Sequence, residues 1–286
     1  MNSFTETLYD SYAQVLRVDE LLFEEKTDHQ HLVIFHNAAF GRVMVLDGIV
    51  QTTEKDEFIY HEMLAHTPIL AHGAPQSVLI IGGGDGGMLR EVTRHRFLEQ
   101  IFLVEVDRRV IALCRRYLPN HSQGAFNDPR VTIVIDDGLH FVQTTDRRFD
   151  IIIVDSTDPI GPGQALFSFD FYAASHRVLR PGGVLVTQNG VPFLCLDEMV
   201  NTAAHLRRLF ADWHFFGAAV PTYVGGIMAF GWASDNPSLR QRNLDNLQHA
   251  FTQSGITTRY YNPQVHRAAF VLPQYLLDAI GKASRG

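Results

Sequence analysis

Two acidic residues with a short, fixed spacing are the most informative feature of the sequence. Asp155 and Asp158 stand three residues apart, directly after the segment 149–154, which is apolar apart from Asp150. Such a run is typical of a strand buried on both faces of a sheet, so both carboxylates are predicted to emerge where the strand ends. Ligands bind at this edge in open α/β sheets, and paired carboxylates there can hold an amine and accept its proton. An Asp before a proline also shapes ordinary turns. The upstream residues are therefore needed to decide whether these acids bind a ligand or only form a turn.

A glycine-rich turn lies upstream, between an apolar run and a helical stretch. Gly82, Gly84 and Gly86 have the spacing of S-adenosylmethionine-type enzymes, and ending the pattern at Gly87 instead gives the dinucleotide fingerprint. Glycines at these positions let the backbone approach a ligand closely. Asp85 favours the first interpretation, because an acid inside the turn repels a phosphate and attracts a sulfonium or ammonium group.

Two further predicted strands also end in acids. Glu105 and Asp107 follow the apolar run 101–104, and Asp136-Asp137-Gly138 follows the run 131–135. A carboxylate about twenty residues past the glycines is placed to bind ribose hydroxyls, and Glu105 is the first acid there. Asp107 suits the N-cap of the next helix. Three strands that deliver acids to one rim predict an adenosine-bearing ligand.

The elements that must position these residues fall into two parts. Residues 1–53 carry short apolar runs separated by turn residues such as Asp47-Gly48, which predicts a small N-terminal antiparallel β domain. Thr53 and Asp56 form a capping pattern before a helix over about 57–70, within a linking segment 54–75 that closes near Pro68 to Gly73.

Residues 76–286 alternate strands with helices, which predicts an α/β, Rossmann-like doubly wound sheet. A helix over 169–179 is expected to end in the turn Arg180–Gly183, before a strand over 184–188. A final antiparallel pair, 215–220 and 227–233, favours the methyltransferase type, because a dehydrogenase tends to continue with parallel units.

Composition narrows the function classes. The chain has 286 residues, 46% of them apolar, and a formal charge of −7, which argues against nucleic-acid binding and suits a cationic substrate. Cys114 and Cys195 are too few for a disulfide framework and are expected to be core residues, which favours a reducing compartment. No leader pattern and no apolar run of about 20 residues is present, so we expect a cytoplasmic protein without membrane contact.

Three side chains can be interpreted either as part of a site or as part of the core. One histidine pair resembles a zinc-binding signature. Tyr60, His61 and Tyr223 can either line a cleft or pack with their polar atoms satisfied. His61-Glu62-x-x-x-His66 is one residue too long for the zinc signature. Residues five apart lie roughly 140° around a helix and cannot share one ion, so we expect no metal site.

Several segments in unbroken order, from about residue 4 to 280, resemble the spermidine synthase family. The segments that carry the resemblance are Leu46-Asp-Gly-Ile-Val-Gln51, Thr53-Glu-x-Asp-Glu-Phe58, Gly82-Gly-Gly-Asp-Gly-Gly87, Val104-Glu-Val-Asp107, Asp136-Asp-Gly138, Asp155-Ser-Thr-Asp-Pro-Ile-Gly-Pro162, Pro221-Thr-Tyr223, Arg259-Tyr-Tyr-Asn262 and His266-Arg-Ala-Ala-Phe-Val-Leu-Pro273. The resemblance implies an aminopropyltransferase that transfers the aminopropyl group of decarboxylated S-adenosylmethionine to putrescine, giving spermidine and methylthioadenosine. It also implies a homodimer, with the sulfonium compound as a co-substrate and no separate cofactor.

The resemblance also implies roles for single residues on the donor side. Asp155 matches the family's proton acceptor and Asp85 the acid that holds the donor's ammonium group. Glu105 matches the ribose-binding acid. The remaining positions match contacts to the nucleoside, and they are Gln30, Asp137, Gly138 and Pro162.

On the acceptor side, the resemblance places four residues at the polyamine. These are Tyr60, His61, Asp158 and Tyr223, with Asp85 shared between the two substrates. Two rival functions remain open. One is a putrescine N-methyltransferase that uses S-adenosylmethionine, and the other is a non-catalytic nucleoside-binding protein of the same fold.

Overall fold

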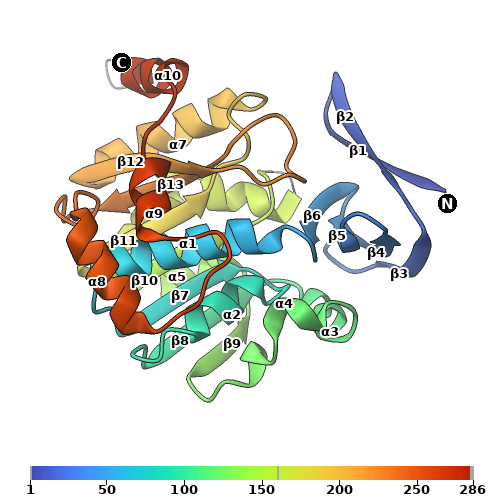
Figure 1. Cartoon of the computed structure of the whole chain (residues 1–286), viewed down its shortest axis with the longest axis horizontal. Helices are drawn as coiled ribbons and strands as arrows, with labels where there is room; N and C mark the ends of the chain where they lie inside the picture. Colours follow the sequence, from blue (N-terminus) through green and yellow to red (C-terminus); the bar gives the residue numbers. More distant parts are fainter. Residues whose placement is uncertain (1, 160, 284–286) are drawn as a thin grey trace.

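The computed structural model describes residues 2–159 and 161–283, and two β systems dominate it (Figure 1). In the N-terminal part, β1 (Ser3–Tyr9) pairs with β2 (Tyr12–Arg17) as a separate antiparallel hairpin. The next four strands form an antiparallel sheet in chain order: β3 (Glu20–Lys26), β4 (His31–Asn37), β5 (Gly41–Leu46) and β6 (Ile49–Thr53). The predicted antiparallel N-terminal region is therefore confirmed.

The turn between β5 and β6 forms at Asp47-Gly48, as the sequence predicts. Both residues have positive φ, 49° and 82°, which a tight hairpin turn with the right twist requires. The Asp47 carboxylate also accepts the backbone N–H of His31 at 2.8 Å. The turn is thereby tied to the neighbouring strand.

The larger part is built on one seven-stranded sheet with the strand order β12-β13-β11-β10-β7-β8-β9. Its strands are β7 (Ser77–Gly82), β8 (Gln100–Glu105), β9 (Val131–Ile135), β10 (Phe149–Asp155), β11 (Leu179–Gln188), β12 (Asp212–Ala218) and β13 (Met228–Ser234). The five strands from β11 to β9 run parallel, while β13 and β12 form the appended antiparallel pair at the other edge. Chain order reverses between β7 and β10, so a crevice opens beyond their carboxyl ends.

Helices cover both faces of this sheet (Figure 1). They are α1 (Glu57–His72), α2 (Gly87–Thr93), α3 (Arg108–Tyr117), α4 (Pro119–Ser122), α5 (Gly138–Thr144), α6 (Phe169–Val178), α7 (Leu196–Leu209), α8 (Leu244–Ser254), α9 (Pro263–Ala269) and α10 (Gln274–Ala283), with short 3₁₀ turns η1 (Ala125–Asn127) and η2 (Gly161–Phe167). Alternate residues of β7 face opposite cores: Ile80 packs with α1 and α2, and Ile81 with α5 and α6. Burial on both sides explains the unbroken apolar runs.

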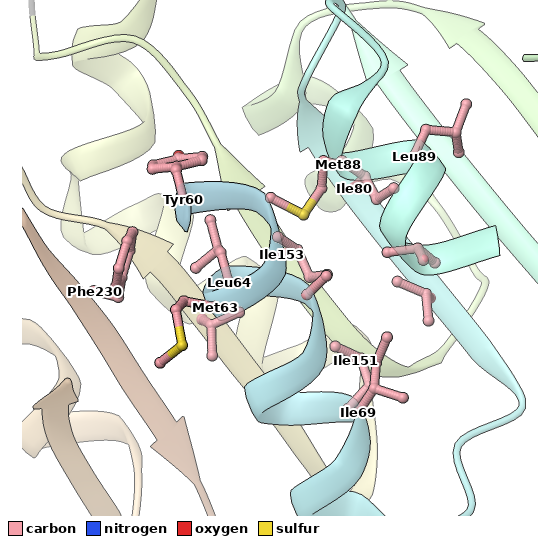
Figure 2. Close-up of a cluster of buried hydrophobic side chains, with 14 of the residues drawn as sticks. Tyr60, Met63, Leu64, Ile69, Ile80, Met88, Leu89, Ile151, Ile153 and Phe230 are labelled. Atoms are coloured by element: carbon pink, nitrogen blue, oxygen red, sulfur yellow. The ribbon is translucent and has the colours of Figure 1, made fainter. Parts of the chain in front are cut away.

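Helix α1 joins the two parts and is buried along nearly its whole length. Figure 2 shows side chains of α1 packed against the sheet and α2. The labelled residues are Tyr60, Met63, Leu64 and Ile69 of α1, Ile80, Ile151, Ile153 and Phe230 of the sheet, and Met88 and Leu89 of α2. A second contact joins the parts, because the four-stranded sheet packs on α3 through Ile34, Met44 and Cys114. These contacts hold the N-terminal sheet over the crevice.

Helix α1 closes within the predicted interval Pro68 to Gly73: it runs to His72 and is capped by Gly73, whose φ is 89°. Pro68 lies inside the helix, which continues past the hydrogen bond that proline removes because it is buried on all sides. Two other local predictions need correction. The turn expected at Arg180–Gly183 is the irregular start of β11, where the pairing with β10 slips. Asp56 precedes α1, but its side chain makes no cap.

Candidate active site

A pocket opens at the crevice and brings together the acids that the sequence places on separate strands. Among the residues lining it are Gln30, Tyr60, His61, Gly82, Gly84, Asp85, Glu105, Asp137, Gly138, Asp155, Asp158 and Tyr223. Two predicted site residues differ. Gly86 is not among the lining residues, and the side chain of Pro162 lies outside the described part of the chain.

Asp155 ends β10 directly beside the glycine turn. Its backbone carbonyl accepts the N–H of Gly83 at 2.9 Å, and a side chain at Gly82 would collide with that carbonyl. Its carboxylate accepts the Tyr60 hydroxyl at Oδ1, while Oδ2 is buried without a partner among the described residues. Burial raises the pKa of Asp155 to about 6. Tyr60 therefore satisfies both interpretations, since it is buried and lines the pocket.

His61 lies between two carboxylates. Its Nδ1 is 2.6 Å from Glu57 Oε2, and its Nε2 is 3.6 Å from Asp85 Oδ2. Gly87 matters here, because a side chain at that position would overlap the imidazole ring. Burial disfavours a charged ring, but the charge of Asp85 and the hydrogen bond to Glu57 outweigh it and raise the pKa of His61 to about 9. Asp85 itself also accepts the N–H of Gly87 at 2.8 Å.

Glu105 lies at the end of β8 against the glycine turn. Its Oε1 accepts the N–H of Asp107 at 2.9 Å, and a Cβ added to Gly84 would lie 2.7 Å from its Oε2. The absent side chain at Gly84 thus makes room for this carboxylate. Burial raises the pKa of Glu105 to about 7, although backbone hydrogen bonds from Asp107 and Gly84 pull in the opposite direction.

Loops from both parts of the chain form the side of the pocket that the sequence predicts to bind a nucleoside. Asp107 caps α3 by accepting the N–H of Arg109, and its other oxygen accepts Gln30 Nε2 at 3.1 Å. The expected capping role is thus confirmed, and it also orients Gln30. Asp137 caps α5 through the N–H of His140 at 2.8 Å, with its side chain exposed, and Gly138 packs against Ile81.

Asp158 also lines the pocket, and it interacts with a second acid, Glu198, outside the lining. Burial raises the pKa of Asp158, and burial with the charge of Asp158 raises that of Glu198 to about 8. Cys195 was expected among apolar residues but lies half-buried beside Tyr9 and Glu198. Burial raises its thiol pKa to about 12, so it stays protonated and is no nucleophile. Tyr223 lies in this region and donates to the Gln51 carbonyl at 2.5 Å.

Two functional contacts escaped sequence analysis. Glu57 and Arg90 are buried together, with Arg90 donating to both carboxylate oxygens of Glu57 at 3.0 and 2.9 Å. Glu57 in turn holds His61, four residues further along the same helix. The i, i+4 spacing of Glu57 and His61 could have predicted their contact. The sequence analysis compared His61 only with the zinc signature and therefore missed this spacing.

The histidine pair of that signature does separate, as its spacing predicts. His66 contacts Glu91 and His95 at 3.0 and 2.9 Å, away from His61. Ligand atoms of His61, Asp85 and Asp155 do lie within 4.8 Å of one another in the described structure. Such spacing suits a small cation, and carboxylates can equally hold an organic ammonium group by charge-assisted hydrogen bonds.

Comparisons with known proteins agree with this geometry. A sequence model described as the spermine/spermidine synthase domain matches residues 57–243, and one described as the spermidine synthase tetramerisation domain matches residues 3–54. The chain belongs to the spermine/spermidine synthase family. The expected family is thereby confirmed, and so is its fold.

Relatives within this family match over the full chain. The chain is 61% identical over 282 residues to polyamine aminopropyltransferase 1 of Pseudomonas aeruginosa, covering 99% of both chains. It is 59% identical over 284 residues, again 99% of both, to the polyamine aminopropyltransferase of Pseudomonas syringae pv. tomato. A solved spermidine synthase in complex with the transition-state analogue AdoDATO superposes with a TM-score of 0.92 at 36% identity, over 98% of this chain and 94% of that one. The spermidine synthase of Thermotoga maritima gives 0.89 at 35%, with the same coverage.

Proposed function

We propose that this protein is a polyamine aminopropyltransferase of the spermidine synthase type. It transfers the aminopropyl group of decarboxylated S-adenosylmethionine to putrescine, giving spermidine and methylthioadenosine. The observation that carries the proposal is Asp155 with one buried, unpartnered oxygen, set in a pocket with Asp85 and Asp158. The full-length relatives named polyamine aminopropyltransferase support the same activity.

The chemistry needs a neutral amine, because the nucleophile attacks a carbon beside a positive sulfur. A primary alkyl amine resembles lysine, with a pKa of about 10.4, and an ordinary Asp titrates near 3.9. Moving the proton between them would cost roughly 9 kcal/mol. With the Asp155 pKa at about 6, the gap falls to roughly 6 kcal/mol. Burial of the amine lowers its pKa and narrows the gap further.

We assign the donor to the side of the pocket formed by the glycine turn. Glu105 binds the ribose hydroxyls, and its neighbours at the adenine side complete the nucleoside site, namely Gln30, Asp137, Gly138 and Pro162. Asp85 holds the ammonium of the aminopropyl arm. An intact S-adenosylmethionine carries a carboxylate there, which Asp85 repels, so this residue also selects the donor.

We assign the acceptor to the side lined by Tyr60, His61 and Tyr223. Asp155 accepts the proton from the attacking amine, and Asp158 anchors the distal ammonium directly or through a water. Alignment of amine, carbon and sulfur supplies several kcal/mol of the barrier through proximity. The length of diamine that fits between Asp155 and Asp158 then sets the acceptor preference.

The deciding experiment incubates the protein with decarboxylated donor and a panel of diamines, with products identified by mass. A product heavier than the diamine by an aminopropyl group supports the proposal. Transfer of a methyl group from S-adenosylmethionine would indicate a putrescine N-methyltransferase instead. Binding of the nucleoside without turnover would indicate a non-catalytic protein.

The reaction as proposed needs no metal and no cofactor beyond its two substrates. Dialysis against a chelator should therefore leave turnover unchanged, and loss of activity that zinc or another divalent ion restores would contradict this. A cytoplasmic location is proposed on the two free cysteines, Cys114 and Cys195. None of the described helices is long and apolar enough to cross a membrane.

We also propose that the protein is a homo-oligomer. The sequence analysis favoured a dimer, while the match of residues 3–54 to a tetramerisation domain points to a larger assembly. The exposed strands of this region carry apolar side chains such as Val15 and Leu21, which suit an interface. Light scattering at micromolar concentration decides between dimer and tetramer, and a monomer would refute both.

A further inference from the structure

A continuous row of buried charges leads from the protein interior to the donor site. Arg90 on α2 holds both oxygens of Glu57, Glu57 holds His61 Nδ1 at 2.6 Å, and His61 Nε2 faces Asp85 at 3.6 Å. All four side chains are less than a tenth exposed. Arg90 is fixed in turn by Glu91 at 2.8 Å and by the carbonyl of His121 at 2.7 Å.

The geometry around His61 identifies its charge state in the empty site. Each ring nitrogen faces a carboxylate, and a neutral imidazole can donate a proton to only one of them. An imidazolium donates to Glu57 at Nδ1 and forms an ion pair with Asp85 at Nε2. Besides these carboxylates, the charged and titratable groups around the ring come from four other places, namely Tyr60, Arg90, His121 and Asp155.

Arg90 helps to keep the Glu57 carboxylate ionised beside His61. Burial opposes ionisation of Glu57, but hydrogen bonds from His61 and Arg90 outweigh it and lower its pKa to about 2. Glu57 therefore remains negative and holds the His61 ring in place. The second N–H of that ring, at Nε2, then points to Asp85. The raised pKa of His61, about 9, agrees with this geometry.

We propose that protonated His61 is the resident cation of the empty donor site, and that the donor's ammonium group takes its place on Asp85 and expels one proton to the solvent. The proposal rests on the assignment of Asp85 to the donor's ammonium. Two cations in one buried site repel each other, and the imidazolium gives up its proton more readily than the alkyl ammonium, because its reference pKa is about 6.5 and that of the ammonium about 10.4. Glu57 and Arg90 are positioning residues in this exchange; the ring keeps its proton on Nδ1 against the Glu57 carboxylate, so its deprotonated Nε2 can accept a hydrogen bond.

The exchange makes donor binding pH-dependent. Because binding releases a proton, the dissociation constant of the donor should fall about tenfold per pH unit between pH 6.5 and 8.5, below the pKa of His61. A neutral nucleoside such as methylthioadenosine occupies the same pocket without bringing a cation. Its affinity should not show this slope.

Titration calorimetry in buffers of different ionisation heats counts the protons directly. At pH 7.5 we expect about one more proton released by decarboxylated S-adenosylmethionine than by methylthioadenosine. Any proton lost from Glu105 cancels in this comparison, because both ligands carry the ribose. The dimethylsulfonium derivative of adenosine carries the sulfonium without the ammonium and should release no extra proton. If it released as many protons as decarboxylated S-adenosylmethionine, the proposed exchange at Asp85 would be overturned.

Two histidine variants complete the test. His61→Gln keeps a polar side chain against Asp85 but cannot titrate, so the extra proton should disappear. His66→Gln is the matched control, because His66 is also buried on α1 against a carboxylate, at 3.0 Å from Glu91, but lies outside the pocket. Release that persists in His61→Gln would overturn the proposal. Absence of any donor binding heat in the wild type would instead refute the proposed function.

Discussion

The phenolic oxygen of Tyr60 lies 2.8 Å from Oδ1 of Asp155 and donates its proton there. The other carboxylate oxygen, Oδ2, has no partner among the described residues and is buried. One oxygen is thus used to orient the group and the other remains available. A carboxylate held in this way can accept a proton from a substrate amine without first turning, which lowers the cost of reaching the reactive arrangement.

Asp155→Asn should keep the shape of the site and lose the proton acceptor. We expect turnover to fall roughly 100- to 10,000-fold, with nucleoside affinity nearly unchanged. Raising the pH should restore part of the rate, since more amine then arrives neutral. Steady-state kinetics from pH 7 to 9.5 checks this, with Asp158→Asn as the comparison, which should act on acceptor KM more than on kcat. Wild-type turnover by Asp155→Asn at neutral pH would refute the assignment.

Tyr60→Phe should move the pH profile in a known direction. The hydrogen bond from Tyr60 lowers the pKa of Asp155 against the dominant effect of burial, so its removal should raise that pKa. The acid limb of kcat/KM should then shift to higher pH. Tyr223→Phe is a matched control, because that hydroxyl donates to the Gln51 carbonyl. An identical shift in both variants would speak against the Tyr60 contact as the cause.

Asp85→Asn should change donor selectivity more than turnover at saturation. An asparagine oxygen still accepts the N–H of Gly87, so the glycine turn should hold its shape. Loss of the negative charge should weaken binding of the decarboxylated donor and narrow its advantage over S-adenosylmethionine. Competition binding with both sulfonium compounds measures the ratio, and an unchanged ratio would remove this role from Asp85.

Gly84→Ala should weaken nucleoside binding without altering the acceptor site. The added methyl group would lie 2.7 Å from Glu105 Oε2 and 2.9 Å from Val110, so the carboxylate must move away from its position at the ribose. We expect donor and methylthioadenosine affinities to fall together, by about 10-fold or more. Gly281→Ala, where nothing lies within 4 Å, is the control and should leave both affinities unchanged.

The charge of His61 should also appear in the stability of the empty protein. Its pKa is raised on folding to about 9, so its contribution is complete below the unfolded value of 6.5 and is lost as the pH rises through 9. The melting temperature of the wild type relative to His61→Gln should therefore decrease between pH 6.5 and 9.5. A constant difference over this range would show that His61 does not titrate as described.

Much of this architecture follows from the sequence because the decisive signals are local. Apolar runs such as 151–154 contain enough information to predict a strand buried on both faces, and the acid that follows each run marks its end. Order along the chain does not reveal which strand ends are neighbours. The pairing of Asp155 with Gly82 depends on the strand order of the folded sheet, which the sequence analysis did not predict.

What the sequence could not predict are contacts between distant segments. Nothing in the pattern indicates that Arg90 reaches Glu57, or that Thr222 donates its N–H to Asp56, 166 positions earlier in the chain. Asp56 consequently looked like a helix cap, although its carboxylate serves the loop that carries Tyr223. Side-chain partners of this kind are fixed by tertiary packing, which outweighs local preference.

Glu62 has a consequence for how the chain is made. Its buried carboxylate on α1 accepts the backbone N–H groups of Arg259, Tyr260 and Tyr261, at distances of 2.8 to 3.1 Å. A ribosome delivers residue 62 long before residue 259. We expect this carboxylate to stay hydrated during synthesis, which keeps α1 from settling fully into the core until the segment 259–261 arrives.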